Sequence, residues 1–244
     1  MLREREASNE RALDEPVTRM TAGGNYHPAV KRCFDVMVAS GLLVILAPVM
    51  SVIAVLIKLD SRGPVFFSQE RMGSKRRTEG QGITNWEIKP FRVLKFRSMV
   101  NNADQSVHES HIRAFVNGTL EQVGDERTVK LDRDKRITRV GNVIRRTSLD
   151  ELPQLINVVK GEMSLVGPRP VPVYEVEGYQ PRHFERLHAL PGITGIWQVE
   201  GRGQVPFEEM VRMDIWYVRN ASFWLDLKIM LQTIPAVLRG KGAA

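Results

Sequence analysis

Two adjacent carboxylates, Asp150 and Glu151, are the residues of this sequence whose type and spacing best suit chemistry. Ser148 precedes them, and a serine followed three residues later by a glutamate predicts a capping box at the start of a helix. The unpaired N–H groups and partial positive charge of a helix N-terminus keep a carboxylate ionised. Asp150 is therefore a candidate nucleophile or hard-cation ligand. The structural alternative is an ordinary acidic first turn in which Glu151 only caps the helix.

Basic residues surround this carboxylate pair in the sequence, and they are Lys95, Arg97, Arg136, Arg145 and Arg169. Arginine forks match the oxygens of phosphate groups, so the set predicts a site for a diphosphate. A divalent cation held between carboxylate and phosphate would complete such a site. The alternative for any single arginine is a solvated surface. Arg169 is the strongest candidate, because the prolines on both sides of it fix its backbone.

An apolar segment at residues 36–57 contains no ionisable side chain and has Pro48 in its middle. About 22 helical residues are enough to cover the ~30 Å of a bilayer core. Proline removes a backbone donor and clashes with the preceding turn, so a kink is expected at Pro48. Basic residues flank both ends of the segment and give no clear inside–outside asymmetry. Two interpretations remain open: a helix that spans the membrane, and a bent helix that enters and leaves on the same face.

Composition narrows the function classes without choosing one. The 244 residues carry a net charge of +7, which suits an anionic membrane, a nucleotide or a nucleic acid. The lone Cys33 excludes an intramolecular disulfide and a cysteine-rich metal site. The sequence has no P-loop, no G-x-G-x-x-G and no G-x-S-x-G motif. These absences argue against a nucleoside triphosphatase, a Rossmann enzyme and a serine hydrolase.

The remaining pattern predicts a mostly helical α/β fold with a small β element. Short strands are expected at 65–67 and 91–99, with a basic loop or hairpin at 71–90 and an irregular segment at 164–172. Outside the apolar segment, helices are expected at 103–116, 148–160, 173–177, 181–188, 207–217 and 224–238. The aromatic residues of the C-terminal third suit a membrane interface and an ordinary core equally.

From residue 30 onward the sequence resembles the bacterial sugar transferases, the monotopic phosphoglycosyl transferases that act on polyprenyl phosphate. The resemblance lies in six stretches, in the family's order: KRCFDV (31–36), GPVFFSQERMG (63–73), FRVLKFRSM (91–99), RITRVGNVIRRTSLDELPQLINVVKGEMSLVGPRP (136–170), LPGITGIWQVEGRG (190–203) and DIWYVRNASFWLDLKIMLQT (214–233). The run from SLDELPQL to GPRP is too long for a chance match.

The charged residues 1–28 fall outside the resemblance and are expected to form a flexible tail. The resemblance implies a re-entrant membrane helix at 29–60, broken at Pro48, and a catalytic domain at 61–244. The catalytic domain would have amphipathic helices and would lie on the cytoplasmic face of the bacterial inner membrane. Membrane lipids are expected partners, a homodimer is included among the partners to be tested, and nucleic acid is not expected.

The resemblance also implies the reaction. Asp150 would attack the sugar-bearing phosphorus of a UDP-sugar, release UMP and carry the sugar phosphate to undecaprenyl phosphate or another polyprenyl phosphate. Asp150 and Glu151 would bind Mg²⁺, and Arg169 would contact nucleotide or phosphate. Weaker phosphate ligands would be Lys95, Arg97, Arg136 and Arg145. The product would initiate an exopolysaccharide, capsule, O-antigen or glycoprotein glycan.

Two alternatives belong to other function classes. A single-span anchor joined to a nucleic-acid-binding module would use the basic stretches at 71–77 and 133–146. A structural protein of the membrane surface would use the carboxylate pair for stability alone. No recognisable helix-turn-helix, RNA-binding or zinc-finger pattern accompanies these basic stretches.

Overall fold

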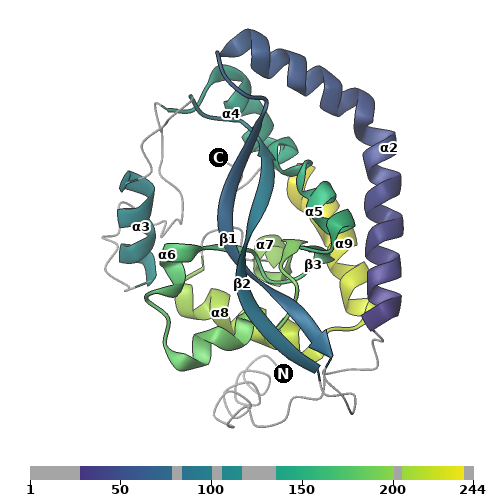
Figure 1. Cartoon of the computed structure of the whole chain (residues 1–244), viewed down its shortest axis with the longest axis vertical. Coiled ribbons are helices and arrows are strands. Elements are labelled where there is room, and N and C mark those ends of the chain that lie inside the picture. The colour runs from purple at the N-terminus through teal and green to yellow at the C-terminus, as the bar shows by residue number, and fades with distance from the viewer. Residues whose placement is uncertain (1–27, 79–83, 101–105, 117–135, 201–204, 239–244) are drawn as a thin grey trace.

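A 33-residue helix, α2 (Pro28–Asp60), dominates the first part of the computed structural model, which describes residues 28–78, 84–100, 106–116, 136–200 and 205–238. Among these residues α2 is the one helix long and apolar enough to cross a membrane. Figure 1 shows it bent into two arms, and Pro48 is the proline inside it. The kink expected from the missing donor at Pro48 therefore agrees with the observed bend.

Both arms of α2 pack on the rest of the protein. The first arm joins the largest apolar core, where Ala39 is fully buried beside Val158 and Ile229. The second arm packs Ile53 and Ile57 against Phe96 in a separate core. Between these contacts the helix leaves apolar side chains on its surface, including Val44, Ile45, Val49, Val52 and Leu56.

A long hairpin, β1 (Phe66–Thr78) and β2 (Thr84–Phe96), runs through the middle of the molecule (Figure 1). The strands pair antiparallel over their whole length, with Arg71 opposite Phe91. The hairpin alternative for the basic stretch 71–90 is thus confirmed, and both strands are longer than the sequence predicted. A short strand, β4 (Val171–Pro172), pairs with β1 on its other edge, so the sheet order is β2-β1-β4.

The segment 164–172 contains two short strands, and the prediction that it is irregular was wrong. β3 (Ser164–Val166) pairs in parallel with β5 (Gly192–Thr194), and β4 follows after four intervening residues. The prolines interrupt only the turn between β3 and β4, because proline is tolerated at strand ends and edges.

Helices and turns enclose the hairpin. They are α3 (Ser106–Val116), α4 (Arg139–Arg146), η1 (Leu149–Glu151), α5 (Gln154–Lys160), α6 (Val173–Val176), η2 (Pro181–Leu187), α7 (Ile196–Glu200), α8 (Phe207–Asn220) and α9 (Phe223–Leu238). The expected helices near 106–116, 173–176, 207–220 and 223–238 are present, whereas 181–187 is a 3-10 helix. The sequence did not predict α4 or α7. The tail at 1–27 and most of the expected loop at 117–136 lie outside the described residues.

The C-terminal aromatic residues divide between core and surface. Trp197 and Tyr217 are buried, whereas Trp224 at the start of α9 is 75% exposed. A fully buried guanidinium, that of Arg186, bridges Asp214 and Glu175 beneath α8. Paired carboxylates of this kind are the usual condition for burying a charged group.

Candidate active site

Asp150 and Glu151 lie in η1, a short 3-10 turn between α4 and α5, and not in the first turn of a regular helix. The capping box predicted at Ser148 is absent: Ser148 has a φ of 56° and its side chain makes no capping hydrogen bond. A left-handed non-glycine residue costs about 1–3 kcal/mol. The left-handed conformation of Ser148 interrupts the helix between α4 and η1, two residues before Asp150, so this residue sets the local path of the chain into the site.

Two cations meet on one oxygen of Glu151. The Lys95 ammonium, near the end of β2, lies 2.9 Å from Oε1. The Arg169 guanidinium, in the turn between β3 and β4, lies 3.0 Å from the same oxygen. Although burial alone would raise the pKa of the Glu151 carboxyl, these two cations hold it well below its usual range. Glu151 therefore stays ionised at any physiological pH.

The other oxygen of Glu151 and the carboxylate of Asp150 have no hydrogen bond or ion pair within the described residues. Asp150 is partly exposed, and burial raises the pKa of its carboxyl while Lys95 and Arg145 oppose that rise. These carboxylate oxygens are the hard donors that Mg²⁺ prefers, and Mg²⁺ commonly takes only one or two carboxylates plus substrate phosphates. The pair therefore fits such an ion, although no cluster of three or more metal-ligating side chains occurs in the described part of the chain.

A third cation completes the electropositive wall, and the sequence did not single it out. Arg71 on β1 lines a small cavity together with Lys95 and Arg169. Burial is the main reason that the pKa of Arg71 is lowered to about 10, and repulsion from Arg169 adds to the shift. Arg71, Lys95 and Arg169 thus gather donors that match the oxygens of an anionic ligand beside the Asp150 and Glu151 carboxylates. The sequence did not identify Arg71 because residues 71–78 were not recognised as part of a strand. Without the strand, nothing indicated toward which side the Arg71 side chain points.

The remaining predicted residues are distributed as follows. Arg145 lies in the last turn of α4 and acts electrostatically on Asp150, so it belongs to the same neighbourhood. Arg136 precedes α4, and its backbone carbonyl accepts a hydrogen bond from the amide of Val100. A phosphate-binding role for Arg136 stays a prediction.

Arg97 does not join the site. Its guanidinium donates to the carbonyls of Arg62 and Ser61, at 3.0 and 2.7 Å, and so binds the end of α2. The side chain is 4% exposed. The structure thus gives Arg97 a role in anchoring α2, and none of its printed contacts within the described residues reaches the carboxylate pair, so its phosphate contact stays a prediction. Helix C-termini present unpaired carbonyls that a guanidinium satisfies well.

The sequence is similar to known proteins along most of its length. The family model described as bacterial sugar transferase matches residues 26–240. The UDP-galactose-lipid carrier transferase of Erwinia amylovora is 41% identical over 214 residues, which are 88% of this chain and 41% of that protein. The exopolysaccharide production protein ExoY of Sinorhizobium fredii is 39% identical, with 87% of both chains covered. The undecaprenyl-phosphate galactose phosphotransferase of Salmonella typhimurium is 40% identical, with 88% of this chain and 41% of that protein covered. The chain thus spans less than half the length of two of these relatives and most of the third.

Proposed function

The chain belongs to the bacterial sugar transferase family, and from this premise we propose that it transfers a sugar phosphate from a UDP-sugar to a polyprenyl phosphate. The relatives' names supply the reaction class, since one is an undecaprenyl-phosphate galactose phosphotransferase and another an exopolysaccharide production protein. The observation that carries the proposal is the pairing of Glu151 with Lys95 and Arg169 beside Asp150, whose carboxylate has no ion pair among the described residues. This arrangement offers a nucleophile and a diphosphate-binding wall in one place.

The reaction would proceed in two displacements. A carboxylate oxygen of Asp150 attacks the sugar-bearing phosphorus, and the bond from that phosphorus to the bridging oxygen breaks, releasing UMP. Asp150 then holds the sugar phosphate as an acyl phosphate. An oxygen of the polyprenyl phosphate attacks the same phosphorus, the bond to Asp150 breaks, and a polyprenyl diphosphate sugar leaves. Arg71, Lys95 and Arg169 would bind the phosphate oxygens throughout.

Asp150 and the second oxygen of Glu151 would hold Mg²⁺, which when bound neutralises charge on the diphosphate and on the departing UMP. Glu151 has a further role that needs no ion. Because its carboxylate pairs with both Lys95 and Arg169, it fixes the spacing of the two cations that face the substrate.

A re-entrant α2 on the cytoplasmic face is part of the proposal, and it is supported by where the ends of the helix are held. At the first end, Arg32 donates to the carbonyls of Val158 and Val159 of α5. At the second end, Asp60 accepts a hydrogen bond from the amide of Val140 in α4. A straight helix of about 33 residues would be ~50 Å long and would separate its ends by a whole bilayer. Two ends bound to one body favour entry and exit on the same face.

Chemistry gives a reason for this topology. The charged head of a polyprenyl phosphate stays at the interface because moving it into hydrocarbon or water is costly. The nucleophile must therefore lie at headgroup height, where a bent, partly inserted helix holds it. Membrane lipids are accordingly expected to contact the exposed apolar side chains of α2, and a homodimer stays a prediction.

The test is a panel of UDP-sugars incubated with undecaprenyl phosphate and Mg²⁺, with UMP release as the readout. At least one sugar should give turnover, and Asp150→Asn should abolish it while membrane binding persists. Glu70→Gln is the matched control, because it removes an exposed carboxylate from β1 and should leave turnover unchanged. Mass spectrometry of the trapped protein should find the sugar phosphate on Asp150. Normal turnover of Asp150→Asn, or an adduct at another residue, would show that the nucleophile is misassigned.

A further inference from the structure

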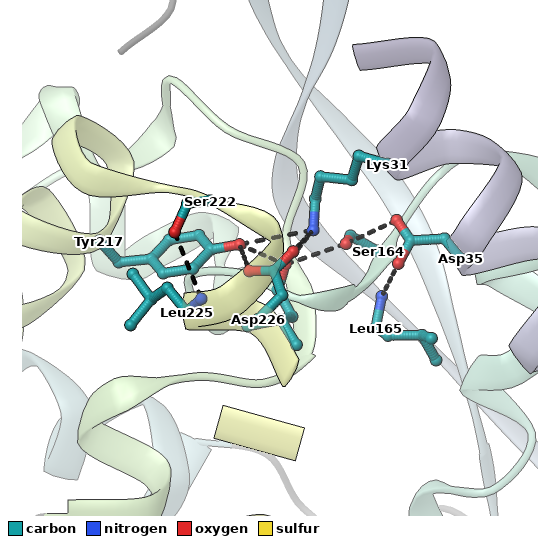
Figure 2. Close-up of polar contacts among 9 residues, drawn as sticks. Lys31, Asp35, Ser164, Leu165, Tyr217, Ser222, Leu225 and Asp226 are labelled. Carbon is teal, nitrogen blue, oxygen red and sulfur yellow. Dashed lines mark hydrogen bonds and ion pairs between the residues drawn. The ribbon is translucent and has the colours of Figure 1, made fainter. Parts of the chain in front are cut away.

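A buried polar cluster joins the first turns of α2 to β3, α8 and α9 (Figure 2). The Lys31 ammonium lies 2.5 Å from a carboxylate oxygen of Asp226. The Tyr217 hydroxyl lies 2.7 Å from the other oxygen of that carboxylate. We call the residues Lys31, Asp35, Ser164, Tyr217 and Asp226 the clasp. Its members come from α2, from β3 and from the consecutive helices α8 and α9, so three distant parts of the sequence meet here.

Asp35 binds β3 directly. Its carboxylate accepts hydrogen bonds from the hydroxyl of Ser164 at 2.8 Å and from the amide of Leu165 at 3.2 Å. Asp35 is 1% exposed, so both contacts are shielded from water. A carboxylate removed from water and bound by two donors fixes the distance between its helix and the strand.

The clasp converges on a single backbone atom, the carbonyl oxygen of Val166. The Lys31 ammonium and the Ser164 and Tyr217 hydroxyls lie 3.2, 2.9 and 3.0 Å from it. Each hydroxyl has a single hydrogen, which it shares between this carbonyl and the carboxylate of Asp35 or Asp226. Val166 is the last residue of β3, and Arg169 follows three residues later. No described residue of the clasp touches the carboxylate pair itself, so any effect on chemistry must pass through the backbone.

The turn from Val166 to Arg169 is held on its other side too. The Gly167 amide donates to the Thr194 carbonyl at 2.9 Å, and the Gly192 amide donates to the Pro168 carbonyl at 2.8 Å. A Cβ on Gly167 would lie 2.3 Å from the Leu190 carbonyl, so the backbones are in close contact here. A turn fixed this tightly moves with β3 as one piece, and Arg169 moves with it.

We propose that the clasp positions Arg169, so that the first turns of the membrane helix form part of the scaffold of the active site. The inference rests on the proposed function for what Arg169 binds. Lys31, Asp35 and Ser164 are then positioning residues: Lys31 and Ser164 act on the Val166 carbonyl, Asp35 holds Ser164 and Leu165 of the same strand, and together they place the Arg169 guanidinium on Glu151. Displacement of the first arm of α2 from the rest of the protein would release Val166 and loosen Arg169 within the electropositive wall that it forms with Arg71 and Lys95.

The simpler account is that the clasp only stabilises the fold. The two accounts differ in whether the effect of losing Lys31 depends on Arg169. If Lys31 acts through Arg169, its removal should matter much less once the guanidinium is replaced by the shorter ammonium of Arg169→Lys. A purely structural role predicts the same fractional loss in both backgrounds.

The experiment measures kcat/KM for UMP release by Lys31→Met, Arg169→Lys and the double variant. Lys58→Met, an exposed lysine at the other end of α2, is the matched control and should leave kcat/KM unchanged. Misplacing a binding group by about 1 Å costs on the order of 100-fold, so Lys31→Met should lose about 10- to 100-fold. In the Arg169→Lys background it should lose less than about 3-fold. Equal losses in the two backgrounds, or no loss from Lys31→Met alone, would overturn the proposal.

A second measurement does not need turnover. Hydrogen exchange at the amides of Gly167 and Arg169 should be faster in Lys31→Met than in Lys58→Met, because the turn has lost its anchor. Unchanged exchange would overturn the proposal even if no UDP-sugar were turned over, whereas a wild-type protein inactive on every UDP-sugar would refute the proposed function alone. If Lys31→Met does not fold, Ser164→Ala removes one hydroxyl from the same carbonyl and is judged by the same outcomes.

Discussion

Asn157 connects the helix after the carboxylate pair to the strand that carries Lys95, and its removal gives the most quantitative prediction. The side chain is fully buried. Its oxygen accepts from the amide of Leu94 at 3.0 Å, and its amide donates to the carbonyl of Arg92 at 2.8 Å and to Glu162 at 2.7 Å. It therefore supplies backbone partners to the edge of β2 that β1 does not cover.

Asn157→Ala would leave one partly buried N–H and one partly buried C=O on β2 without their partner. An unsatisfied buried group costs about 1–3 kcal/mol, and water can reach part of these two, so the lower value applies to each and the expected loss is about 2 kcal/mol. For a chain of this size, 1 kcal/mol shifts Tm by about 2–4 °C. Tm should therefore fall by about 4–8 °C. KM for the UDP-sugar should also rise, because the contact between Lys95 and Glu151 depends on the spacing of β2 and α5.

The assay is thermal unfolding of the purified protein in one detergent or nanodisc, followed by intrinsic fluorescence. Asn142→Ala is the matched control, since it makes the same change at an exposed position of α4 and should shift Tm by no more than about 2 °C. If Asn157→Ala lowers Tm no further than Asn142→Ala does, the hydrogen bonds of Asn157 do not support β2, and the account of how Lys95 is placed is wrong.

Three further predictions concern pH and packing. Arg145→Gln removes a cation that lowers the pKa of Asp150, so the acid limb of kcat/KM against pH should move to higher pH. Burial lowers the pKa of His183, so below about pH 6.5 the unfolded chain binds a proton that the folded chain does not. The free energy of unfolding therefore decreases as the pH is lowered, and in His183→Asn Tm should depend less on pH between about 5 and 7. Gly141→Ala would place a Cβ 1.9 Å from the Ser98 carbonyl, so α4 must shift, and Tm should fall by about 5 °C or more, whereas an unchanged Tm would contradict the packing described.

The features that the sequence predicted best are those with a local physical signature. The long apolar segment and its proline are visible within one stretch of the chain, and the helices of the C-terminal third follow from the spacing of apolar residues within each helix. The carboxylate pair and Arg169 were also identified correctly as neighbours in space. That prediction came from the arginines near the carboxylates and from the prolines beside Arg169, because the acidic turn by itself favoured an ordinary helix start.

The features that the sequence missed depend on contacts between distant segments. Ser148 has the sequence of a helix cap, yet it adopts a left-handed conformation because α4 and α5 must both pack on α2 and the hairpin. Residues 71–78 are basic and contain glycine, which disguises a strand. That strand is stabilised by thirteen paired positions on β2, a partner that local propensity does not consider.

Lys95 and Arg97 show most clearly why composition could not assign the site. They are two residues apart and both basic, so an extended β2 would point them to the same face. β2 ends at Phe96, and the Arg97 amide donates to the Val65 carbonyl at 2.9 Å, which continues the register of the hairpin. The two side chains differ in their partners: the Lys95 ammonium binds Glu151, whereas the Arg97 guanidinium binds the end of α2. The same short stretch thus connects the second arm of α2 to Lys95, as the clasp connects the first arm to the strand before Arg169.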